Sequence, residues 1–584
     1  MTNTIDKWED IDWAKAEAEV FSVQRRIFKA SKGGDRAKVH KLQQLLITSH
    51  SARCVAVRRV AQKNKGKKTA GVDGIKSLTP PQMLRLAIDL KIDGQASPLR
   101  RIQIPKTNGK KRPLSIPTIA DRARQTLIAM ALWPQWEARL PPHMFGFRRG
   151  RSVHDAVASI RHYIQRTPRW LLDADISSFF DNICRDALMK KLDTLPSIRR
   201  AIRNMLKSGI VENFKWIRND KGVPQGSALS VLLGCIILSG IEEDLAKAFP
   251  PTRRINGQKI GETPRLVCYA DDLVVFSKRR DVIVEVKAFL SEWLAGYGLG
   301  FNEEKTRIAH TLDGGSDATG FDFLGFTFTQ RRVGKHQLSP WFNGVLTRIT
   351  PSQKAIKALK EKVSGIIMST RPNPKRNAVY AHQSSKGLPG HQERMINELN
   401  PILRGWANHF RFQNSKETFA DIDHWLWVKL WQWTKRHHGK KISRHELVKR
   451  FFNGGNPWIF KVLKPASGKP TELLKLASIK VDHKDHKCVR ADASYYGESW
   501  IYWTRIRGKY PGISTGAAHA MRKQNGICPR CKKAIQEGQR LSMIVTSGSN
   551  LQGQSQLIVH ATCMISTDKE GGSGSIGSAG RDRQ

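Results

Sequence analysis

The chain has 584 residues, enough for about four domains at ~150 residues each. The chain has 99 Lys and Arg residues against 50 Asp and Glu, which gives a net charge of +49. Such an excess favours polyanionic partners, with nucleic acid as the first candidate and an anionic membrane as the second. The longest apolar stretch, residues 228–241, is shorter than the ~20 residues of a spanning helix, and the acidic start lacks a signal-peptide core. A cytoplasmic protein with no membrane partner is predicted. The eight cysteines are too sparse for a disulfide framework.

Basic residues are concentrated near the start of the chain. Residues 53–68 contain seven Lys or Arg and no acid, and residues 100–112 contain six. A lone stretch of this kind is usually a solvated surface. Here the whole chain shares the bias, so contact with phosphates is favoured.

The middle of the chain combines strand and helix patterns. Short β-rich runs alternate with apolar positions at helical spacing, as in residues 154–166 and 281–295, which predicts an α+β domain. Beyond residue 340 the strand signals fade, and a basic helical bundle is predicted. Nine of the sixteen tryptophans lie there or later, interleaved with cations. They either stack on unpaired bases or pack a helical core. Residues 464–470 are predicted to be a linker and residues 571–580 a flexible tail.

The candidate catalytic carboxylates lie in two acidic motifs, residues 173–181 (DADISSFFD) and residues 269–272 (YADD). Alternation along a strand sends Asp173 and Asp175 to one face, and Asp271 and Asp272 are expected at a hairpin tip. Burying several carboxylates together is costly unless cations neutralise them, and Mg²⁺ prefers carboxylate oxygens. Two such ions ~4 Å apart could activate a 3′-hydroxyl and stabilise a leaving pyrophosphate.

These motifs resemble the palm of reverse transcriptases, and further motifs resemble the ordered blocks of group II intron-encoded proteins. The latter are GVDG (71–74), IPKTNGKKRPLSIPTIADR (104–122), GVPQGSALS (222–230), GFNEEKTRI (300–308), FLGF (323–326) and, in the maturase region, LNPILRGWANHFRF (399–412). The resemblance covers roughly residues 50–450.

The resemblance implies a right-hand-like polymerase with fingers, palm and a helical thumb, followed by small C-terminal DNA-binding and zinc-like modules. The predicted divisions are an N-terminal extension with an RNA-binding fingers element (1–95), fingers and palm (96–335), thumb or maturase domain (340–463), DNA-binding region (471–520), degenerate HNH-like zinc module (521–567) and tail (568–584).

The resemblance also assigns roles to individual residues. Asp175, Asp271 and Asp272 match the three metal-binding carboxylates, while Asp173 is expected to support the fold. The predicted nucleotide-binding residues are Lys106, Arg112, Phe180, Gln225 and Lys305. Lys106 and Arg112 match fingers residues that hold the triphosphate, with generic RNA-backbone contact as the alternative.

Phe180 matches the residue that excludes a ribose 2′-hydroxyl, so dNTPs are the expected substrates. Core packing is its alternative, and alternation lets only one of Phe179 and Phe180 face the nucleotide. Gln225 matches a residue beside the nascent base pair. Lys305 matches a proton donor on the pyrophosphate side, with an ordinary surface lysine as the alternative.

Near the C-terminus, Cys528, Cys531, His560 and Cys563 have the ligand types and spacing of a structural Zn²⁺ site, with a metal-free remnant as the alternative. The segment resembles an HNH endonuclease module. However, residues 542–550 replace the expected histidines and Met564 stands where a further histidine would follow. Without an imidazole base, DNA cleavage is not expected.

The sequence therefore predicts an RNA-directed DNA polymerase with Mg²⁺ as cofactor and Zn²⁺ as a second, structural metal. Its predicted partners are group II intron RNA, target DNA and dNTPs, and it would serve as a splicing maturase for retrohoming. A non-enzymatic RNA-binding maturase is the alternative. The presence of YADD, Asp175 and PQG favours the enzyme.

Overall fold

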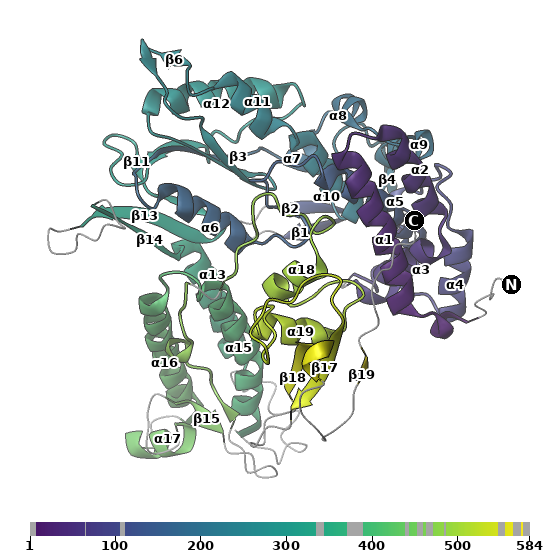
Figure 1. Ribbon diagram of the computed structural model, residues 1–584. Helices are drawn as coiled ribbons and strands as arrows, with labels where there is room; N and C mark the ends of the chain where they lie inside the picture. Colours follow the sequence, from purple (N-terminus) through teal and green to yellow (C-terminus); the bar gives the residue numbers. More distant parts are fainter. Residues whose placement is uncertain are drawn as a thin grey trace. The chain divides into compact units, whose positions relative to one another are not determined.

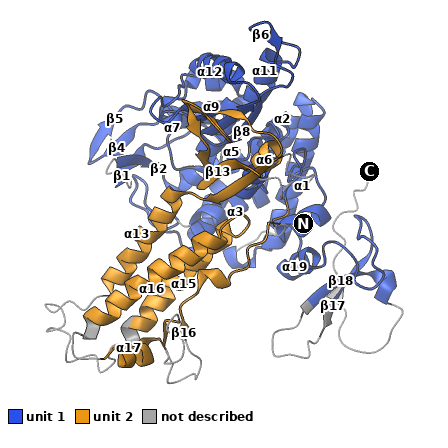
Figure 2. Cartoon of the chain, turned by 90° about the vertical axis from the view of Figure 1, so that its left-hand side faces the viewer, with its two compact units in different colours: residues 1–159, 172–307, 488–584 blue, residues 160–171, 308–487 orange. Residues whose placement is uncertain are grey.

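The structure is a computed structural model that describes residues 7–64, 66–105, 111–333, 344–370, 389–438, 443–452, 459–462, 471–483, 486–546, 555–564 and 574–575. The chain divides into two compact units: unit 1 contains residues 1–159, 172–307 and 488–584, and unit 2 contains residues 160–171 and 308–487 (Figure 2). Helices and sheets occur in both, which confirms the α+β class (Figure 1). Within the described ranges, no helix is long and apolar enough to cross a bilayer.

The N-terminal helices of unit 1 pack against the long, largely buried helix α5 (Ile119–Glu137). The first of them, α1 (Trp13–Lys32), begins where the Asp12 carboxylate accepts hydrogen bonds from two backbone N–H groups, and its apolar side chains recur at three- and four-residue spacing. A buried hydrogen bond of 2.7 Å from Gln43 Nε2 to Gln135 Oε1 ties the helices together. The other helices here are α2 (Arg36–Thr48), α3 (His50–Arg58), the π-helical η2 (Arg59–Lys63) and α4 (Pro80–Asp89).

A four-stranded sheet with the order β2-β1-β4-β5 follows in unit 1, and we call it the fingers sheet. In it, β1 (Leu99–Pro105) pairs antiparallel with β2 (Lys111–Ile116) and parallel with β4 (Ile210–Glu212). Strand β5 (Lys215–Ile217) forms a hairpin with β4 at the edge. Leu99 and Ile210 are buried, and α9 (Pro196–Lys207) supplies apolar neighbours on that side.

The central sheet has the order β11-β10-β3-β9-β8. Its middle strand β3 (Trp170–Asp175) buries Leu172 and Ala174, while Asp173 and Asp175 are half-buried on the other face, as alternation predicts. Strands β8 (Arg265–Tyr269) and β9 (Asp272–Ser277) form an antiparallel hairpin, and α12 (Arg280–Ala295) packs on β9.

The remaining elements around this sheet confirm the predicted alternation of strands and helices. They are α6 (Val153–Ile164), α7 (Phe179–Asn182), α8 (Arg185–Lys191), α10 (Ala228–Leu238), α11 (Ile241–Ala248), β6 (Arg254–Ile255), β7 (Gln258–Lys259), β10 (Arg307–His310) and β11 (Ala318–Thr319).

Unit 2 combines a small sheet with the predicted helical bundle. The expectation that strands end near residue 340 is wrong, because β14 (Val345–Pro351) pairs with all seven residues of β13 (Phe326–Arg332). One face of β14 is largely buried through Val345, Ile349 and Pro351, but Thr347 on that face and Leu346 on the other obscure the alternation in the sequence. The sheet is completed by β12 (Phe321–Phe323), and the bundle contains α13 (Gln353–Ser369), α15 (Pro389–Phe410), α16 (Lys416–His438) and α17 (Arg444–Phe451).

The bundle uses Trp433 for packing. Its side chain is 2% exposed and lies at right angles to the rings of Phe451 and Phe460. The predicted linker at residues 464–470 lies outside the described residues. Its flanking strands β15 (Lys461–Val462) and β16 (Thr471–Glu472) pair with each other, and both belong to unit 2.

Residues 488–584 belong to unit 1, where their aromatic side chains form a core with α1. Trp503, in α18 (Trp500–Arg507), is fully buried, and Tyr495, Tyr496 and Tyr510 surround Phe21. Arg507 donates to the buried carboxylate of Asp155 at 2.5 Å. These side chains, which the sequence showed only as basic and aromatic, therefore hold this segment to the rest of unit 1.

The C-terminal module consists of α19 (Thr515–Lys523), β17 (Leu541–Thr546), β18 (Ser555–His560) and the 3-10 turn η6 (Ala561–Met564). The predicted flexible tail needs a correction at two residues, because β19 (Gly574–Ser575) pairs with β17. Strand pairing uses backbone groups, so a Gly/Ser sequence without core-forming side chains can still add to a sheet edge. The other residues of the tail lie outside the described ranges.

Candidate active site

The Tyr269–Asp272 motif forms the tight turn of the β8–β9 hairpin. Tyr269 pairs with Asp272, and Ala270 has φ +59°, a left-handed conformation that is uncommon outside glycine. Gly146 lies against this turn, and a Cβ at that position would lie 2.3 Å from the Ala270 nitrogen. The hairpin tip predicted from the sequence is confirmed, and it presents Asp271 and Asp272 as neighbours.

The turn lies beside the end of β3. The Ile176 backbone N–H donates to the Asp271 carbonyl at 3.3 Å, which links the residue after Asp175 to the turn. Burial, followed by the carboxylates of Asp271, Asp175 and Asp173, raises the pKa of Asp272 to about 6. Burial and the Asp175 carboxylate also raise the pKa of Asp271. The structure thus gathers the three predicted carboxylates into one site of concentrated negative charge.

Two cations contact the acids of β3. Lys305 Nζ donates to Asp175 Oδ2 at 2.8 Å, and this hydrogen bond, opposed by partial burial, raises the pKa of Lys305. Arg307 Nε donates to Asp173 Oδ2 at 3.2 Å. The sequence left Lys305 open as an ordinary surface lysine, whereas its contact with Asp175 puts it in the site.

A second hydrogen-bonded group connects the fingers sheet to α7. Arg112 Nε, on β2, donates to Gln225 Oε1 at 2.8 Å, and Gln225 Nε2 donates to Asp181 Oδ1 at 3.3 Å. Gly222 keeps the loop close to α7, because a Cβ there would meet the Asp181 carbonyl oxygen at 2.5 Å. Arg112 and Gln225, two predicted nucleotide-binding residues, are thus in direct contact. Lys106, which is predicted to hold the triphosphate together with Arg112, lies outside the described residues.

The two phenylalanines of the acidic motif differ in burial. Phe179 is 4% exposed, whereas Phe180 is half-buried, and their rings meet edge to face at 5.0 Å. They lie on the short helix α7 and not on a strand, so the alternation argument does not apply to them. Burial instead distinguishes the two, and Phe180 is the one that remains accessible.

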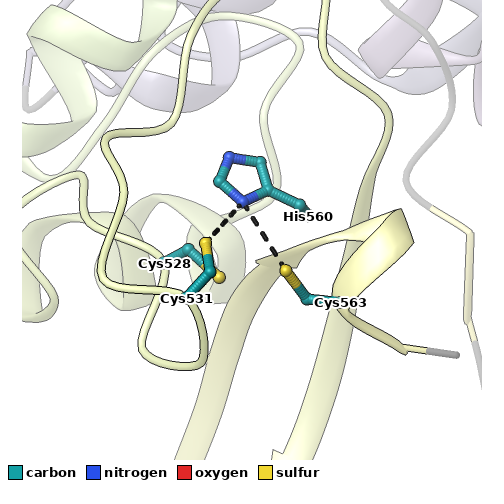
Figure 3. A group of neighbouring side chains, drawn as sticks. All are labelled: Cys528, Cys531, His560 and Cys563. Atoms are coloured by element: carbon teal, nitrogen blue, oxygen red, sulfur yellow. Dashed lines mark hydrogen bonds between the residues drawn. The ribbon is translucent and has the colours of Figure 1, made fainter. Parts of the chain in front are cut away.

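The predicted zinc ligands converge in the C-terminal module (Figure 3). One ligand atom from each of Cys528, Cys531, His560 and Cys563 lies within 4.8 Å of the others. His560 Nδ1 lies 3.2 Å from Cys531 Sγ and 3.9 Å from Cys563 Sγ. Burial opposes ionisation of Cys528, but backbone N–H groups lower the pKa of its thiol to about 6. This arrangement has the donor set and closure of a tetrahedral thiolate and imidazole site.

Sequence reasoning missed several residues that support these sites. Gln539 Oε1 lies 3.0 Å from His560 Nε2 and accepts a hydrogen bond from the Nε2–H tautomer, in which Nδ1 is free to ligate a metal. Asp181 and Arg307 also escaped notice. Asp181 was the last residue of the acidic motif and could have been identified there. Arg307 lies within the GFNEEKTRI motif (300–308) and could also have been identified there, whereas Gln539 carries no distinctive local pattern.

The comparisons with known proteins agree with this geometry. A family described as "Reverse transcriptase (RNA-dependent DNA polymerase)" matches residues 104–328, and one described as "N-terminal domain of reverse transcriptase" matches residues 8–90. A third, "Group II intron, maturase-specific domain", matches residues 381–452. The fold, the carboxylate site and these matches define the chain as a reverse transcriptase, an RNA-directed DNA polymerase.

Similar proteins indicate to which group of reverse transcriptases the chain belongs. Protein YkfC of Escherichia coli is 31% identical over 310 residues, covering 47% of this chain and 79% of that protein. Group II intron-encoded protein LtrA of Lactococcus lactis is 24% identical over 471 residues, covering 68% and 74%. Maturase-like protein 1 of Euglena gracilis is 30% identical over 242 residues, covering 40% and 52%. The chain belongs to the family of group II intron-encoded reverse transcriptase/maturase proteins.

Proposed function

We propose that this reverse transcriptase copies intron RNA through nucleotidyl transfer at Asp175, Asp271 and Asp272. The observation that carries the proposal is the position of the β8–β9 turn beside the end of β3, where the Ile176 N–H donates to the Asp271 carbonyl. Burial, followed by the neighbouring carboxylates, raises the pKa of Asp272 to about 6. Carboxylates held this close favour cations between them, and their oxygen donors fit Mg²⁺. Two bound ions would activate the primer 3′-hydroxyl and stabilise charge on the leaving pyrophosphate.

The surrounding residues would position the substrate. Arg112, on an exposed strand end with Gln225 as its partner, would hold phosphate oxygens of the incoming nucleotide. Lys305, already protonated and bonded to Asp175, could donate a proton to the leaving group. The accessible ring of Phe180 would exclude a 2′-hydroxyl by steric contact, so dNTPs would be preferred over NTPs.

The basic charge would supply affinity for the RNA. The net charge of +49 and the maturase-specific match at residues 381–452 support binding of the intron RNA as a splicing cofactor. We further propose that the protein supports retrohoming with target DNA as a second partner. His519 and His560 are the only histidines after residue 488, and His560 belongs to the cysteine cluster. Insertion would therefore use an existing DNA end as primer, without cleavage by this module.

We also infer that Cys528, Cys531, His560 and Cys563 bind a structural Zn²⁺. The ligand atoms already converge, and the Gln539 contact orients His560 for this role. A closed set of four protein ligands has no position for a reactive water, so this metal would stabilise the module and take no part in polymerisation.

Primer extension on an RNA template with purified protein, Mg²⁺ and dNTPs tests the main proposal. The wild-type protein should extend the primer, and Asp271→Ala should abolish extension while RNA binding is retained, because cationic side chains supply the affinity. Extension by Asp271→Ala within about tenfold of wild type would contradict the assigned role. A wild-type protein that binds RNA but extends no primer would instead support the non-enzymatic maturase.

A further inference from the structure

Residues 143–152, which we call the bridging loop, contact the hairpin turn of Tyr269–Asp272. The Phe145 N–H donates to the Cys268 carbonyl at 2.8 Å, so the loop runs along β8. Gly146 follows, and its lack of a side chain lets it approach the left-handed residue of the turn closely. A non-glycine residue keeps that conformation only where its surroundings enforce it. The bridging loop therefore helps to hold the turn that presents the candidate metal ligands.

The second half of the bridging loop contacts the C-terminal part of the chain. Arg151 Nη2 donates to the carbonyl oxygens of Ala491 and Ala493, at 2.6 and 3.1 Å. In the other direction, Arg507 Nε on α18 donates to the Gly150 carbonyl oxygen at 2.8 Å. Each segment thus donates a guanidinium to backbone carbonyls of the other. Such charge-assisted hydrogen bonds fix direction as well as distance.

The contact with the C-terminal part of the chain is tight and largely buried. Gly150 has φ +82°, and a Cβ there would lie 2.6 Å from the fully buried ring of Trp503. The side chain of Arg507 is 16% exposed and also donates to Asp155, whose carboxylate accepts from the Val489 N–H at 2.9 Å. A shift of the C-terminal part would therefore break these hydrogen bonds or move the bridging loop with it.

The two ends of the bridging loop are close together in the sequence and joined by a rigid centre. Gly146, at the turn, precedes Gly150, at α18, by four positions. Between them, the buried Arg148 donates to the Glu137 carboxylate at 2.7 Å and to the Met144 carbonyl at 2.9 Å. These bonds fix the shape of the loop, so a displacement at one end is passed to the other end.

We propose that residues 488–510 position the catalytic carboxylates, with Arg507 as a positioning residue that acts through the bridging loop. This inference rests on the proposed metal-binding role of Asp271 and Asp272 and deepens it. Residues that orient metal ligands without touching the metal set how tightly the metal is held. Loss of the Arg507 contact should therefore weaken Mg²⁺ binding at the carboxylate site, while the basic surface still binds the primer–template.

The test is single-turnover primer extension by the full chain across a Mg²⁺ titration. Arg507→Gln should raise the Mg²⁺ concentration that gives the half-maximal rate by about tenfold, as expected for a residue behind metal ligands. Saturating Mg²⁺ should restore most of the rate. Primer–template affinity, measured by fluorescence anisotropy without Mg²⁺, should stay unchanged. A merely structural role would lower the fraction of active protein without moving the Mg²⁺ midpoint.

Arg505→Gln is the matched control, because it removes the same charge from an exposed position on the same helix. It should keep the wild-type Mg²⁺ midpoint. Arg151→Gln removes the donors on the loop side of the contact and should shift the midpoint in the same direction as Arg507→Gln. It decides the question if Arg507→Gln does not fold. Loss of the fold in both variants would make the contact a structural joint and overturn the positioning role.

A folded Arg507→Gln protein with the wild-type Mg²⁺ midpoint, or an equal shift in Arg505→Gln, would also overturn the proposal. Failure of the metal site itself gives a different result. If Asp271→Ala extends primers as well as wild type, the carboxylate assignment fails whatever Arg507 does. If Asp271→Ala is inactive and the Arg507→Gln midpoint is unchanged, the carboxylate site stands and only the positioning role fails.

Discussion

The carboxylate site and the cysteine–histidine cluster both lie in unit 1, and each joins segments far apart in the sequence, yet they are built for opposite purposes. Asp175, Asp271 and Asp272 are half-buried hard oxygen donors, and Lys305 contacts Asp175. Burial, followed by the neighbouring carboxylates, raises the pKa values of Asp271 and Asp272. The cysteine cluster contains soft donors whose thiolate form is stabilised at Cys528 by backbone N–H groups. A site left electrostatically unsatisfied suits substrate and exchangeable Mg²⁺, whereas a site closed by its own ligands suits permanent structure.

The neighbours of the two sites differ in the same way. Lys305 contacts Asp175 from a turn and is substantially exposed, so it is free to change partners during a reaction. His560 is 9% exposed and is held through Gln539, which itself accepts a hydrogen bond from the backbone of Gln536. The two proposed metal sites thus differ in what surrounds the ligands as well as in the ligands themselves.

The largest expected effect comes from removing one charge at the carboxylate site. Asp272→Asn should lower dNTP incorporation by about a thousandfold, because loss of a metal ligand removes several kcal/mol of transition-state stabilisation. Without Mg²⁺, its melting temperature should be at least that of wild type, since burial and like charges disfavour the ionised carboxyl. Asp173→Asn is the control and should lose less than tenfold, roughly, because Asp173 is paired with Arg307. Equal losses would remove the distinction between the two acids.

A smaller loss is expected from the cation beside Asp175. Lys305→Gln should reduce the single-turnover rate about a hundredfold while primer–template affinity changes little, as expected for loss of a proton donor. Lys287→Gln is the matched control, since Lys287 forms a surface ion pair with Glu303 at 2.9 Å. If both variants retain the wild-type rate in rapid-quench measurements, Lys305 is an ordinary surface lysine.

Sugar selectivity should respond to Phe180 alone of the two phenylalanines. Phe180→Ala should raise the ratio of rNTP to dNTP incorporation by about tenfold, because it removes the ring that opposes the 2′-hydroxyl. Phe179→Leu should lower thermal stability without changing that ratio, since Phe179 is 4% exposed. Steady-state incorporation with each nucleotide set measures the ratio. An unchanged ratio in Phe180→Ala would make Phe180 a packing residue.

The smallest effect on polymerisation is expected from the cysteine cluster. The purified protein should contain about one zinc, and Cys531→Ser should release it and loosen the module while extension stays within about threefold. Cys184→Ser, which changes a cysteine that belongs to no candidate metal group among the described residues, should keep the metal. Metal analysis and limited proteolysis provide the two readouts. A zinc-free wild-type protein would show that the cluster folds without metal.

Local sequence patterns predict much of this architecture. Alternation around Asp173 and Asp175, and two β-rich runs joined by Ala270–Asp271, sufficed to predict a strand and a hairpin tip carrying acids. Helical spacing predicted α6, α12, α13 and α16 because apolar side chains on one face must be buried whatever they pack against. The ligand types and spacing of Cys528, Cys531, His560 and Cys563 likewise limited the chemistry before any fold was known.

Other features depended on contacts between distant residues, which no local pattern encodes. Only the fold shows that Lys305 reaches Asp175, that Arg112 meets Gln225 and that Gln539 orients His560. Trp503 and Arg507, which the sequence shows only as aromatic and basic, contact Gly150 and Asp155, hundreds of positions earlier in the chain. Composition and periodicity indicate what a side chain can do, whereas its neighbours in space decide whether a tryptophan is buried in a core, as Trp503 is, or lies exposed, as Trp216 does at 63%.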